Sequence, residues 1–288
     1  MSEIDIDHLR QWIGREEQQT DVVTPGLVDR FHATLGASAF RTPGEAPLAI
    51  HWCLAPPAVA PDELGPDGHP ARGGFLPPVP LPRRMWAGGQ LDLFEPLPVG
   101  AEVTRVSRIA DVAHKAGRSG ELVFVTVEHM IHCADRAALR ERQDIVYRAA
   151  PQQNARPAAD ASRATGSAAV EPRAAEFSET VEATSTLLFR YSALTFNGHR
   201  IHYDVDYARQ AEGYPGLVVH GPLQATLMLH LAARISSGRT PRGFTYRGVA
   251  PLIHGAPFTV NATTNGQGVD LWCADAAGAA TMTASALF

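Results

Sequence analysis

One segment, Pro222–Ile235, limits the folds open to this chain more than any other. Its apolar residues recur at spacings that place them on nearly every side of a helix, so other parts of the protein must surround it. Strand-like segments rich in β-branched and apolar residues follow over Phe258–Ala262, Val269–Ala274 and Thr281–Phe288. We therefore expect an α+β fold in which a long antiparallel sheet curls around one buried helix.

The first half of the chain shows a similar order of elements. Thr24 and a following proline indicate a helix start, and apolar spacing predicts an amphipathic helix over Pro25–Leu35. The first 36 residues as a whole are helical in character. Strands are predicted over Val103–Val112, Glu121–Cys133 and Gln143–Tyr147. The two halves thus share an order of elements, although no repeat of identical residues is evident.

Three stretches lack a regular pattern. Residues 54–82 are rich in proline and glycine, which predicts an extended loop that ends in the sequence from Arg83 to Gly89. Residues 151–175 contain almost no large apolar side chain, which is typical of a linker. Tyr191–Tyr203 is polar and irregular, after a weakly alternating strand over Glu176–Ser185. We therefore expect two domains, residues 1–150 and 176–288.

Composition excludes several classes of function. A net charge of −5 without a basic stripe gives no reason to expect a nucleic-acid partner. The acidic N-terminus does not resemble a secretory signal, and no run of roughly 18 apolar residues predicts a membrane span. The three cysteines are far apart, which argues against a disulfide framework or a thiolate zinc site. We expect a cytoplasmic enzyme or binding protein.

Polar residues are densest in Phe189–Asp204, and His220 and Gly221 follow just before the apolar helix. Amide groups at a helix start lack internal partners and attract negative charge, and a glycine lets a ligand approach its backbone. A tight turn without any ligand explains Gly221 equally well.

Three interpretations of this polar cluster stay open from residue types alone. The first is an acid–base site centred on His202, whose side chain titrates near neutral pH. The second is a metal site formed by His199, His202 and Asp204, with His220 as a further ligand. The third is an ordinary polar loop.

Two short motifs in this region resemble a known family. Ile201-His202 and His220-Gly221 resemble the hydratase motif of the MaoC-like acyl-CoA hydratases, which have the hotdog fold. Together with Arg83–Gly89, they are most similar to the subgroup of mesaconyl-C4-CoA and itaconyl-CoA hydratases and mitochondrial-type 3-hydroxyacyl dehydratases. This resemblance covers nearly the whole chain.

The resemblance implies a double hotdog in which long curled antiparallel sheet wraps central helices. It implies a degenerate N-terminal domain over residues 1–150, whose helix Pro25–Leu35 lacks the His-Gly start. It also implies a catalytic domain over residues 176–288 that adds water reversibly to the α,β double bond of an enoyl-CoA. A short branched or dicarboxylic acyl group is expected, and neither a metal nor a cofactor.

The motif departs from the family pattern at three positions. The family's catalytic Asp falls on Asn197, its Asn on His199 and its Pro on Arg200. Because an amide cannot accept a proton as a carboxylate does, the resemblance implies that His202 is the main proton carrier and that Asn197 orients the water. His199 or Asp204 is then the candidate for a second titrating group.

Basic residues near the motif suggest an anionic substrate, because arginine pairs with carboxylate or phosphate. Trp86 is a candidate for stacking on adenine or lining the acyl pocket, and core packing explains it as well. The candidates for binding the substrate or its oxyanion are Gly221, His220, His199, Arg200, Tyr191, Arg83, Arg84, Trp86 and Arg247.

Four other functions remain as alternatives. They are a dehydratase of fatty acid synthesis, a hotdog thioesterase, a metal-dependent hydrolase and a non-catalytic module that binds acyl-CoA. In each case an acyl thioester is the expected partner, except for the metal-dependent hydrolase. A homodimer is the expected assembly, with no nucleic acid and no membrane.

Overall fold

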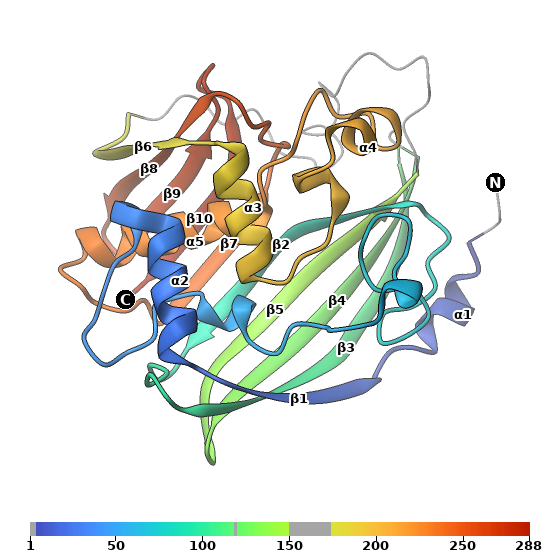
Figure 1. Ribbon diagram of the computed structural model, residues 1–288, viewed down its shortest axis with the longest axis horizontal. Coiled ribbons are helices and arrows are strands. Elements are labelled where there is room, and N and C mark those ends of the chain that lie inside the picture. Colours follow the sequence, from blue (N-terminus) through green and yellow to red (C-terminus); the bar gives the residue numbers. More distant parts are fainter. Residues whose placement is uncertain (1–3, 118–119, 150–173) are drawn as a thin grey trace.

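The computed structural model describes residues 4–117, 120–149 and 174–288. Ten antiparallel strands form one sheet, and helices pack on its concave side (Figure 1). The strands of the first half are β1 (Glu16–Val22), β2 (Arg83–Leu93), β3 (Glu102–Gly117), β4 (Gly120–Cys133) and β5 (Arg136–Arg148). Those of the second half are β6 (Phe177–Glu182), β7 (Gly243–Gly248), β8 (Pro257–Asn265), β9 (Gly268–Ala274) and β10 (Ala280–Leu287). The helices are α1 (Ile6–Arg10), α2 (Pro25–Leu35), α3 (Ser185–Leu194), α4 (Val205–Gln210) and α5 (Gly221–Ile235).

The strand order is symmetrical about the junction of the two halves. It runs β1-β3-β4-β5-β2-β7-β10-β9-β8-β6, so that β2 and β7 meet in the middle. Outward from that junction, the first half runs β2-β5-β4-β3-β1 and the second half runs β7-β10-β9-β8-β6. Each half therefore arranges its five strands in the same order. The sheet therefore consists of two copies of one five-stranded unit, joined through the pairing of β2 with β7.

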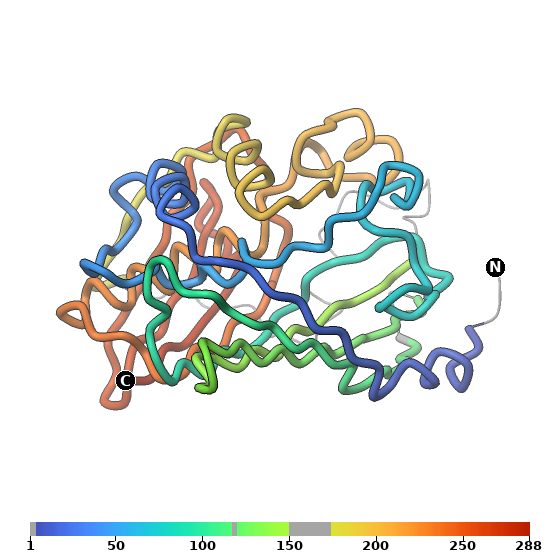
Figure 2. The backbone as a smooth tube through the Cα atoms, turned by 60° about the horizontal axis from the view of Figure 1, so that its bottom comes forward, coloured from blue at the N-terminus to red at the C-terminus, as the bar shows by residue number. Residues whose placement is uncertain are grey.

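The two units also share residues at the start of their first helices. Thr24 caps α2 by accepting a hydrogen bond from the amide of Leu27 at 3.2 Å, and Thr184 caps α3 by accepting one from Leu187 at 3.1 Å. These helices lie side by side (Figures 1 and 2). The expectation that no identical residues repeat is therefore wrong. Over the first strand and this helix, the residues that recur at one constant offset are Glu16, Thr20, Thr24, Leu27, Arg30 and Ala33, matched by Glu176, Thr180, Thr184, Leu187, Arg190 and Ala193.

The predicted central helix is confirmed as α5. Leu223, Met228 and Leu229 are fully buried, and the helix packs against β7, β8, β9 and β10. In the described part of the first half, the matching position before β2 holds the proline-rich segment and two short 3₁₀ turns, Ile50–Cys53 and Pro61–Glu63. The helix α2 (Pro25–Leu35) corresponds to α3. The expectation that it corresponds to the central helix, without the His-Gly start, is therefore wrong.

Three local predictions are wrong. Residues Glu16–Val22 form the edge strand β1 rather than helix, because their side chains alternate between exposed and half-buried without an apolar stripe. The sequence from Arg83 to Gly89 does not end a loop but begins β2, and α3 occupies part of the stretch expected to be irregular. The predicted linker lies outside the described residues up to position 173.

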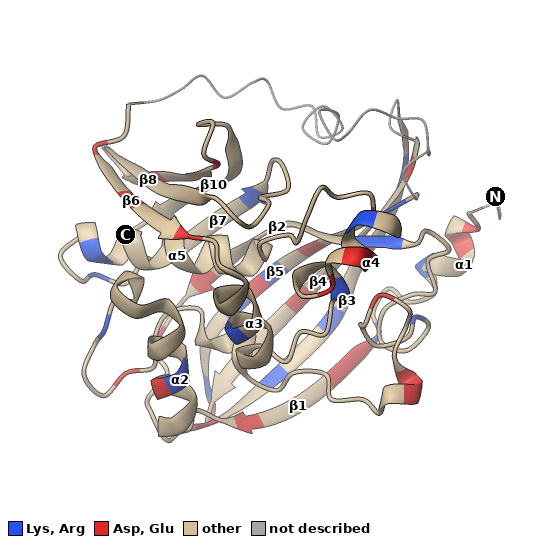
Figure 3. Ribbon diagram, turned by 45° about the horizontal axis from the view of Figure 1, so that its top comes forward, with Lys and Arg blue, Asp and Glu red and all other residues tan. Residues whose placement is uncertain are grey.

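Charged residues are spread over the described chain. Acidic and basic residues are interspersed rather than gathered in a single stripe (Figure 3). None of the described helices has both the length and the apolar character that a membrane crossing requires.

Candidate active site

A cavity of about 1350 Å³ is lined by residues from both halves of the chain. From the first half come the proline-rich segment and the inner faces of several strands. From the second half come the predicted polar segment and the start of α5. The predicted site residues that line this cavity are Asn197, His199, His202, Gly221, Arg84 and Trp86.

His202 lies in a short 3₁₀ turn, Arg200–His202, and is 7 % exposed. Its Nδ1 atom lies 2.7 Å from the carbonyl oxygen of Val218. A carbonyl oxygen only accepts hydrogen bonds, so Nδ1 carries the proton and Nε2 keeps a lone pair. Burial first, and then the charge of His199, lowers the pKa of His202 to about 3. The imidazole is therefore neutral near pH 7 and able to accept a proton.

Two predicted residues support His202 from behind rather than lining the cavity. The ring of His220 stacks on that of His202 with centroids 3.6 Å apart, and its Nε2 lies 2.8 Å from the hydroxyl of Ser192. Tyr191 is buried beside it, with its hydroxyl 3.3 Å from that of Thr226. Both residues hold the turn that carries His202 in place, and neither of them lines the cavity.

Gly221 and Asn197 face the cavity from different elements. Gly221 is the first residue of α5, where amide groups have no intrahelical acceptor. A Cβ atom at this position would lie 3.5 Å from Met282 and 3.7 Å from the Trp86 ring. Asn197 uses its side-chain oxygen to accept a hydrogen bond from the amide of His199 at 3.0 Å. Its Nδ2 group is the part that remains for a water or a ligand.

A buried acidic residue that was not predicted, Glu212, orients His199. Its carboxylate lies 3.0 Å from Nε2 of His199 and 3.5 Å from Nε of Arg83. The carboxylate accepts a hydrogen bond from the Nε2–H group, which leaves the lone pair of His199 on Nδ1. Arg83 also stacks on Tyr214 and does not line the cavity. Its predicted contact with substrate is therefore replaced by a buried ion pair.

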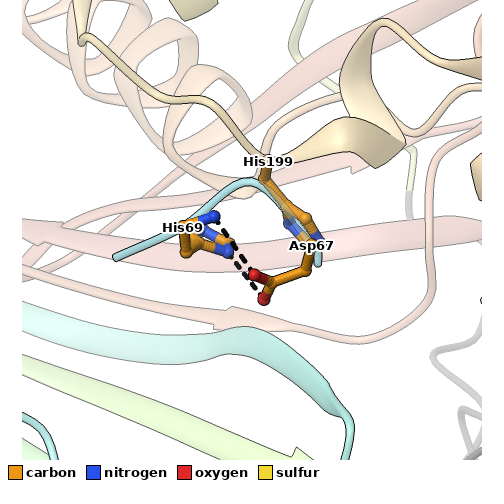
Figure 4. A group of neighbouring side chains, drawn as sticks. All are labelled: Asp67, His69 and His199. Carbon is orange, nitrogen blue, oxygen red and sulfur yellow. Dashed lines mark hydrogen bonds and ion pairs between the residues drawn. The ribbon is translucent and has the colours of Figure 1, made fainter. Parts of the chain in front are cut away.

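The proline-rich segment brings a second unpredicted acid to the site, Asp67. Asp67 accepts hydrogen bonds from the amide and from the Nδ1 atom of His69, at 3.1 and 3.0 Å. The His69 ring lies 4.3 Å from that of His199 and lines the cavity (Figure 4). The segment is attached to the catalytic turn because the amide of Arg200 donates to the carbonyl of Asp67 at 2.9 Å. Only an Asp two residues before a His hinted at this pair in the sequence.

The carboxylate of Asp67 and the imidazoles of His69 and His199 place three possible ligand atoms within 4.8 Å of one another. Such donors suit a divalent metal. Here, however, both oxygens of Asp67 accept from His69, and Nε2 of His199 is bound by Glu212. Hydrogen bonds therefore account for the arrangement of these three side chains.

The metal site considered from the sequence, with Asp204 as a ligand, does not assemble. Asp204 caps α4 by accepting from the amide of Tyr207 at 3.0 Å, and it pairs with Arg200 at 2.8 Å. Neither Asp204 nor Arg200 lines the cavity. Arg200 packs over the ring of Tyr207 and donates to the carbonyl of Pro66, so it fastens the proline-rich segment rather than contacting substrate.

Arg247 lies on the opposite face of the sheet. Successive side chains of a strand point to opposite faces, so Tyr246 is buried on the inner side of β7 while Arg247 is exposed on the outer side. Arg247 lines a separate surface depression together with Asp270 and Trp272. A contact between Arg247 and a ligand in the cavity is therefore excluded by the strand geometry.

An aromatic wall, defined as Trp52, Trp86 and Tyr246, lies next to Gly221, and its two tryptophans line the cavity. The ring centroids of Trp86 lie 5.0 Å from Trp52 and 5.4 Å from Tyr246. Glu141 accepts a hydrogen bond from the Trp52 indole at 2.9 Å. Burial raises the pKa of Glu141 to about 7, although the hydrogen bond from Trp52 opposes this. Trp86 is the member of this wall that lies against Gly221, at the start of α5.

Comparisons with known proteins bear on this site. The family model described as hydroxyacyl-thioester dehydratase type 2 matches residues 49–254. The mesaconyl-C(4)-CoA hydratase of Chloroflexus aurantiacus is 42% identical over 276 residues, which cover 95% of each chain. The mitochondrial hydroxyacyl-thioester dehydratase type 2 of Schizosaccharomyces pombe is 35% identical over 91 residues, 31% of this chain and 29% of that one.

Solved structures share the fold. A MaoC-like dehydratase from Phytophthora capsici superposes with a TM-score of 0.71 at 13% identity, covering 99% of this chain and 97% of its own. A Mycobacterium tuberculosis protein described as a double hotdog superposes with a TM-score of 0.53 at 14% identity, covering 96% of each chain. At such identities the structures show the fold alone, and they confirm the predicted double hotdog.

Proposed function

The chain belongs to the type 2 hydroxyacyl-thioester dehydratase family, and we propose that it adds water reversibly to a short dicarboxylic enoyl-CoA such as mesaconyl-C4-CoA. It is a hydro-lyase of acyl-CoA thioesters, as the sequence motifs indicated. The observation that carries the proposal is the position of His202. Its imidazole is fixed by Val218 with a lone pair on Nε2, in the same cavity as the first amide of α5.

The proposed reaction begins when the thioester oxygen accepts a hydrogen bond from the amide of Gly221. This bond draws electrons from the double bond and makes the β-carbon electrophilic. Nε2 of His202 removes a proton from water while the water oxygen bonds to the β-carbon. The electrons of the double bond move to the α-carbon and the thioester oxygen, and the α-carbon then takes the proton from His202. The histidine is neutral again when the product leaves.

Asn197 has a supporting role in this proposal. Its side-chain oxygen is engaged by the amide of His199, so the Nδ2 group is the part that orients the attacking water. Of the two further residues expected from the sequence, His199 and Asp204, only His199 lines the cavity.

The reverse direction is a second candidate. Two yeast relatives are named hydroxyacyl-thioester dehydratases, as is the family. The same groups would then remove the α-proton and return it to the departing hydroxyl, by microscopic reversal. A 3-hydroxyacyl thioester on CoA or on a carrier protein would be the substrate in fatty acid synthesis.

The test follows the absorbance of the conjugated thioester with mesaconyl-, itaconyl- and crotonyl-CoA, and with 3-hydroxyacyl-CoA esters. We expect turnover by the wild type and a loss of at least about 100-fold in His202→Gln. His8→Gln, on the exposed face of α1, is the matched control. An unchanged signal with every ester contradicts the proposal, and release of free thiol would favour the thioesterase instead. Binding of an acyl-CoA ester without turnover would favour the non-catalytic binding module.

Several expectations remain predictions alongside this proposal. They are the division into domains at residues 1–150 and 176–288, a homodimeric assembly, a cytoplasmic location and a reaction without metal or cofactor.

A further inference from the structure

Four arginines line the cavity, and two of them are engaged by backbone carbonyls. Arg72 donates to the carbonyl of Val79 at 2.7 Å and also to those of Leu81 and Pro82. Arg105 donates to the carbonyl of Ala55 at 2.6 Å and to a second carbonyl beside it. These guanidinium groups hold loops in place and have little capacity left for a ligand. The four arginines are Arg72, Arg84, Arg105 and Arg148.

Arg84 differs from Arg72 and Arg105 in its surroundings. Within the part of the chain that the structure describes, its guanidinium makes no hydrogen bond and no close ion pair. Its charge nevertheless reaches the Asp67–His69 pair. Burial first and the charge of Arg84 second hold the pKa of His69 well below its usual value. Arg84 is therefore a half-buried cation beside the histidines, ready to bind an anion.

The position of Arg84 on β2 fits the length of a four-carbon diacid. Arg84 and Trp86 lie two residues apart on β2, so they share a face and are roughly 6.6 Å apart along the strand. Trp86 lies against Gly221, where the thioester oxygen is proposed to bind. Bond lengths of about 1.2–1.5 Å give a four-carbon diacid a span of roughly 6 Å between its end oxygens. This span is similar to the spacing of Trp86 and Arg84, so an acyl group held at Gly221 and extended along β2 would carry its free carboxylate toward Arg84.

The charges of Asp67, Arg84 and His69 also favour the binding of a carboxylate. In the free site, anionic Asp67 and cationic Arg84 offset one another, and His69 is neutral with its lone pair on Nε2. An added carboxylate would leave one uncompensated negative charge in a partly buried site. A proton taken up by Nε2 of His69 restores neutrality, because a nearby anion favours the charged imidazolium. His199, the other imidazole against this pair, donates a hydrogen bond from Nε2 to Glu212.

We propose that Arg84 and the Asp67–His69 pair form a subsite for the free carboxylate of the acyl group. The proposal rests on the proposed function and names the part of the site that selects a dicarboxylic substrate. The first half of the chain supplies all three residues, while the second half supplies His202 and Gly221.

The experiment compares kcat/KM for mesaconyl-C4-CoA with that for crotonyl-CoA, which has no free carboxylate. In Arg84→Gln we expect the ratio of the two to fall roughly 10- to 100-fold, the effect of losing a charge-assisted hydrogen bond. Arg84→Lys should restore part of the ratio. Arg148→Gln, which removes a charge from the same cavity, is the matched control and should keep the wild-type ratio.

A second readout follows the proton on His69. The wild-type KM for mesaconyl-C4-CoA should rise with pH from the acidic side of neutrality upward, because His69 is already neutral there in the free site, while the KM for crotonyl-CoA should not. His69→Asn should lower the ratio and abolish this difference in pH dependence. Thermal unfolding of each variant shows whether it is folded before its kinetics are compared.

The outcomes separate the two proposals. Equal losses with both esters in Arg84→Gln would place Arg84 on the phosphates of CoA and overturn the subsite, as would an unchanged ratio. A wild type that hydrates crotonyl-CoA but never mesaconyl-C4-CoA would instead overturn the proposed substrate class. A wild type inactive on every ester would overturn the proposed function itself.

Discussion

The imidazole of His202 donates its Nδ1 proton to the carbonyl of Val218 across 2.7 Å. This bond joins the catalytic turn to the segment that leads into α5. It selects the tautomer in which the lone pair on Nε2 can accept a proton. The carbonyl oxygen thus orients the ring, and no carboxylate is needed for this. The departure at Asn197 is therefore compatible with an active site in which one neutral histidine carries the proton.

The pH dependence of hydration follows from that tautomer. Burial lowers the pKa of His202 to about 3, so the free enzyme keeps its base unprotonated throughout the neutral and mildly acidic range. We expect kcat/KM for crotonyl-CoA to stay level between about pH 5 and pH 8. A loss of activity on acidification that follows a single group near pH 6.5, in protein that is still folded by circular dichroism, would contradict this.

The buried pair of Glu212 and Arg83 should contribute strongly to stability. Both side chains are at most 10% exposed, so Glu212→Gln leaves the guanidinium buried without a counter-charge. We expect a loss of about 3–5 kcal/mol in the free energy of unfolding, measured by urea denaturation. Glu16→Gln breaks an exposed pair with Arg108 and should cost much less. Equal losses in the two variants would show that the burial of the first pair has no energetic consequence.

Glu141 should make stability fall as the pH rises. Burial raises the pKa of this carboxyl to about 7 in the folded state, against 4.5 as the ordinary value. The stabilisation is complete below about pH 4.5 and is lost as the pH rises through 7, because the folded state must then ionise a buried acid. Glu141→Gln should therefore gain stability over the wild type on the order of 3 kcal/mol at pH 8 and little at pH 5. Urea denaturation at both values measures this, and a constant difference would contradict it.

The aromatic wall should limit the length of the acyl group. Trp86 lies against Gly221 and packs edge-on against Trp52, so its removal opens space beyond the helix start. In Trp86→Ala we expect kcat/KM for an eight-carbon enoyl-CoA to rise relative to that for crotonyl-CoA, in a direct kinetic comparison. Trp272→Ala, outside the cavity, controls for the general effect of losing a tryptophan. An unchanged ratio would show that the wall does not restrict the acyl chain.

Much of the fold follows from local pattern. The helix α5 is predictable because burial on every side requires apolar residues on every side. The strand β2 is not, because Gly88 and Gly89 suggest a loop, whereas they are required by close approach. A Cβ atom on Gly88 would lie 2.6 Å from the carbonyl oxygen of Tyr246 on the adjacent strand β7. The need for these glycines is visible only when the halves are paired.

The residues of the candidate site likewise divide into those that local sequence patterns predict and those that they do not. His202 and Gly221 were found because their motif is local in sequence. Asp67 and His69 were missed, since they meet His199 only through the folding of a distant, proline-rich segment. Arg83 was placed on the substrate for the same reason, because its partner Glu212 is far along the chain.

The contact between Gly68 and Gly198 joins the proline-rich segment to the catalytic segment, backbone against backbone. A methyl group on Gly68 would lie 2.0 Å from the carbonyl oxygen of Gly198, and one on Gly198 would lie 2.6 Å from that of Gly68. Gly68 also has a φ of +85°, which side chains other than glycine rarely adopt. The two halves supply different parts of the candidate site, and this close backbone contact fixes their relative position there. A chimera could exchange one half for that of a relative and inherit its choice of substrate, provided that both glycines are kept.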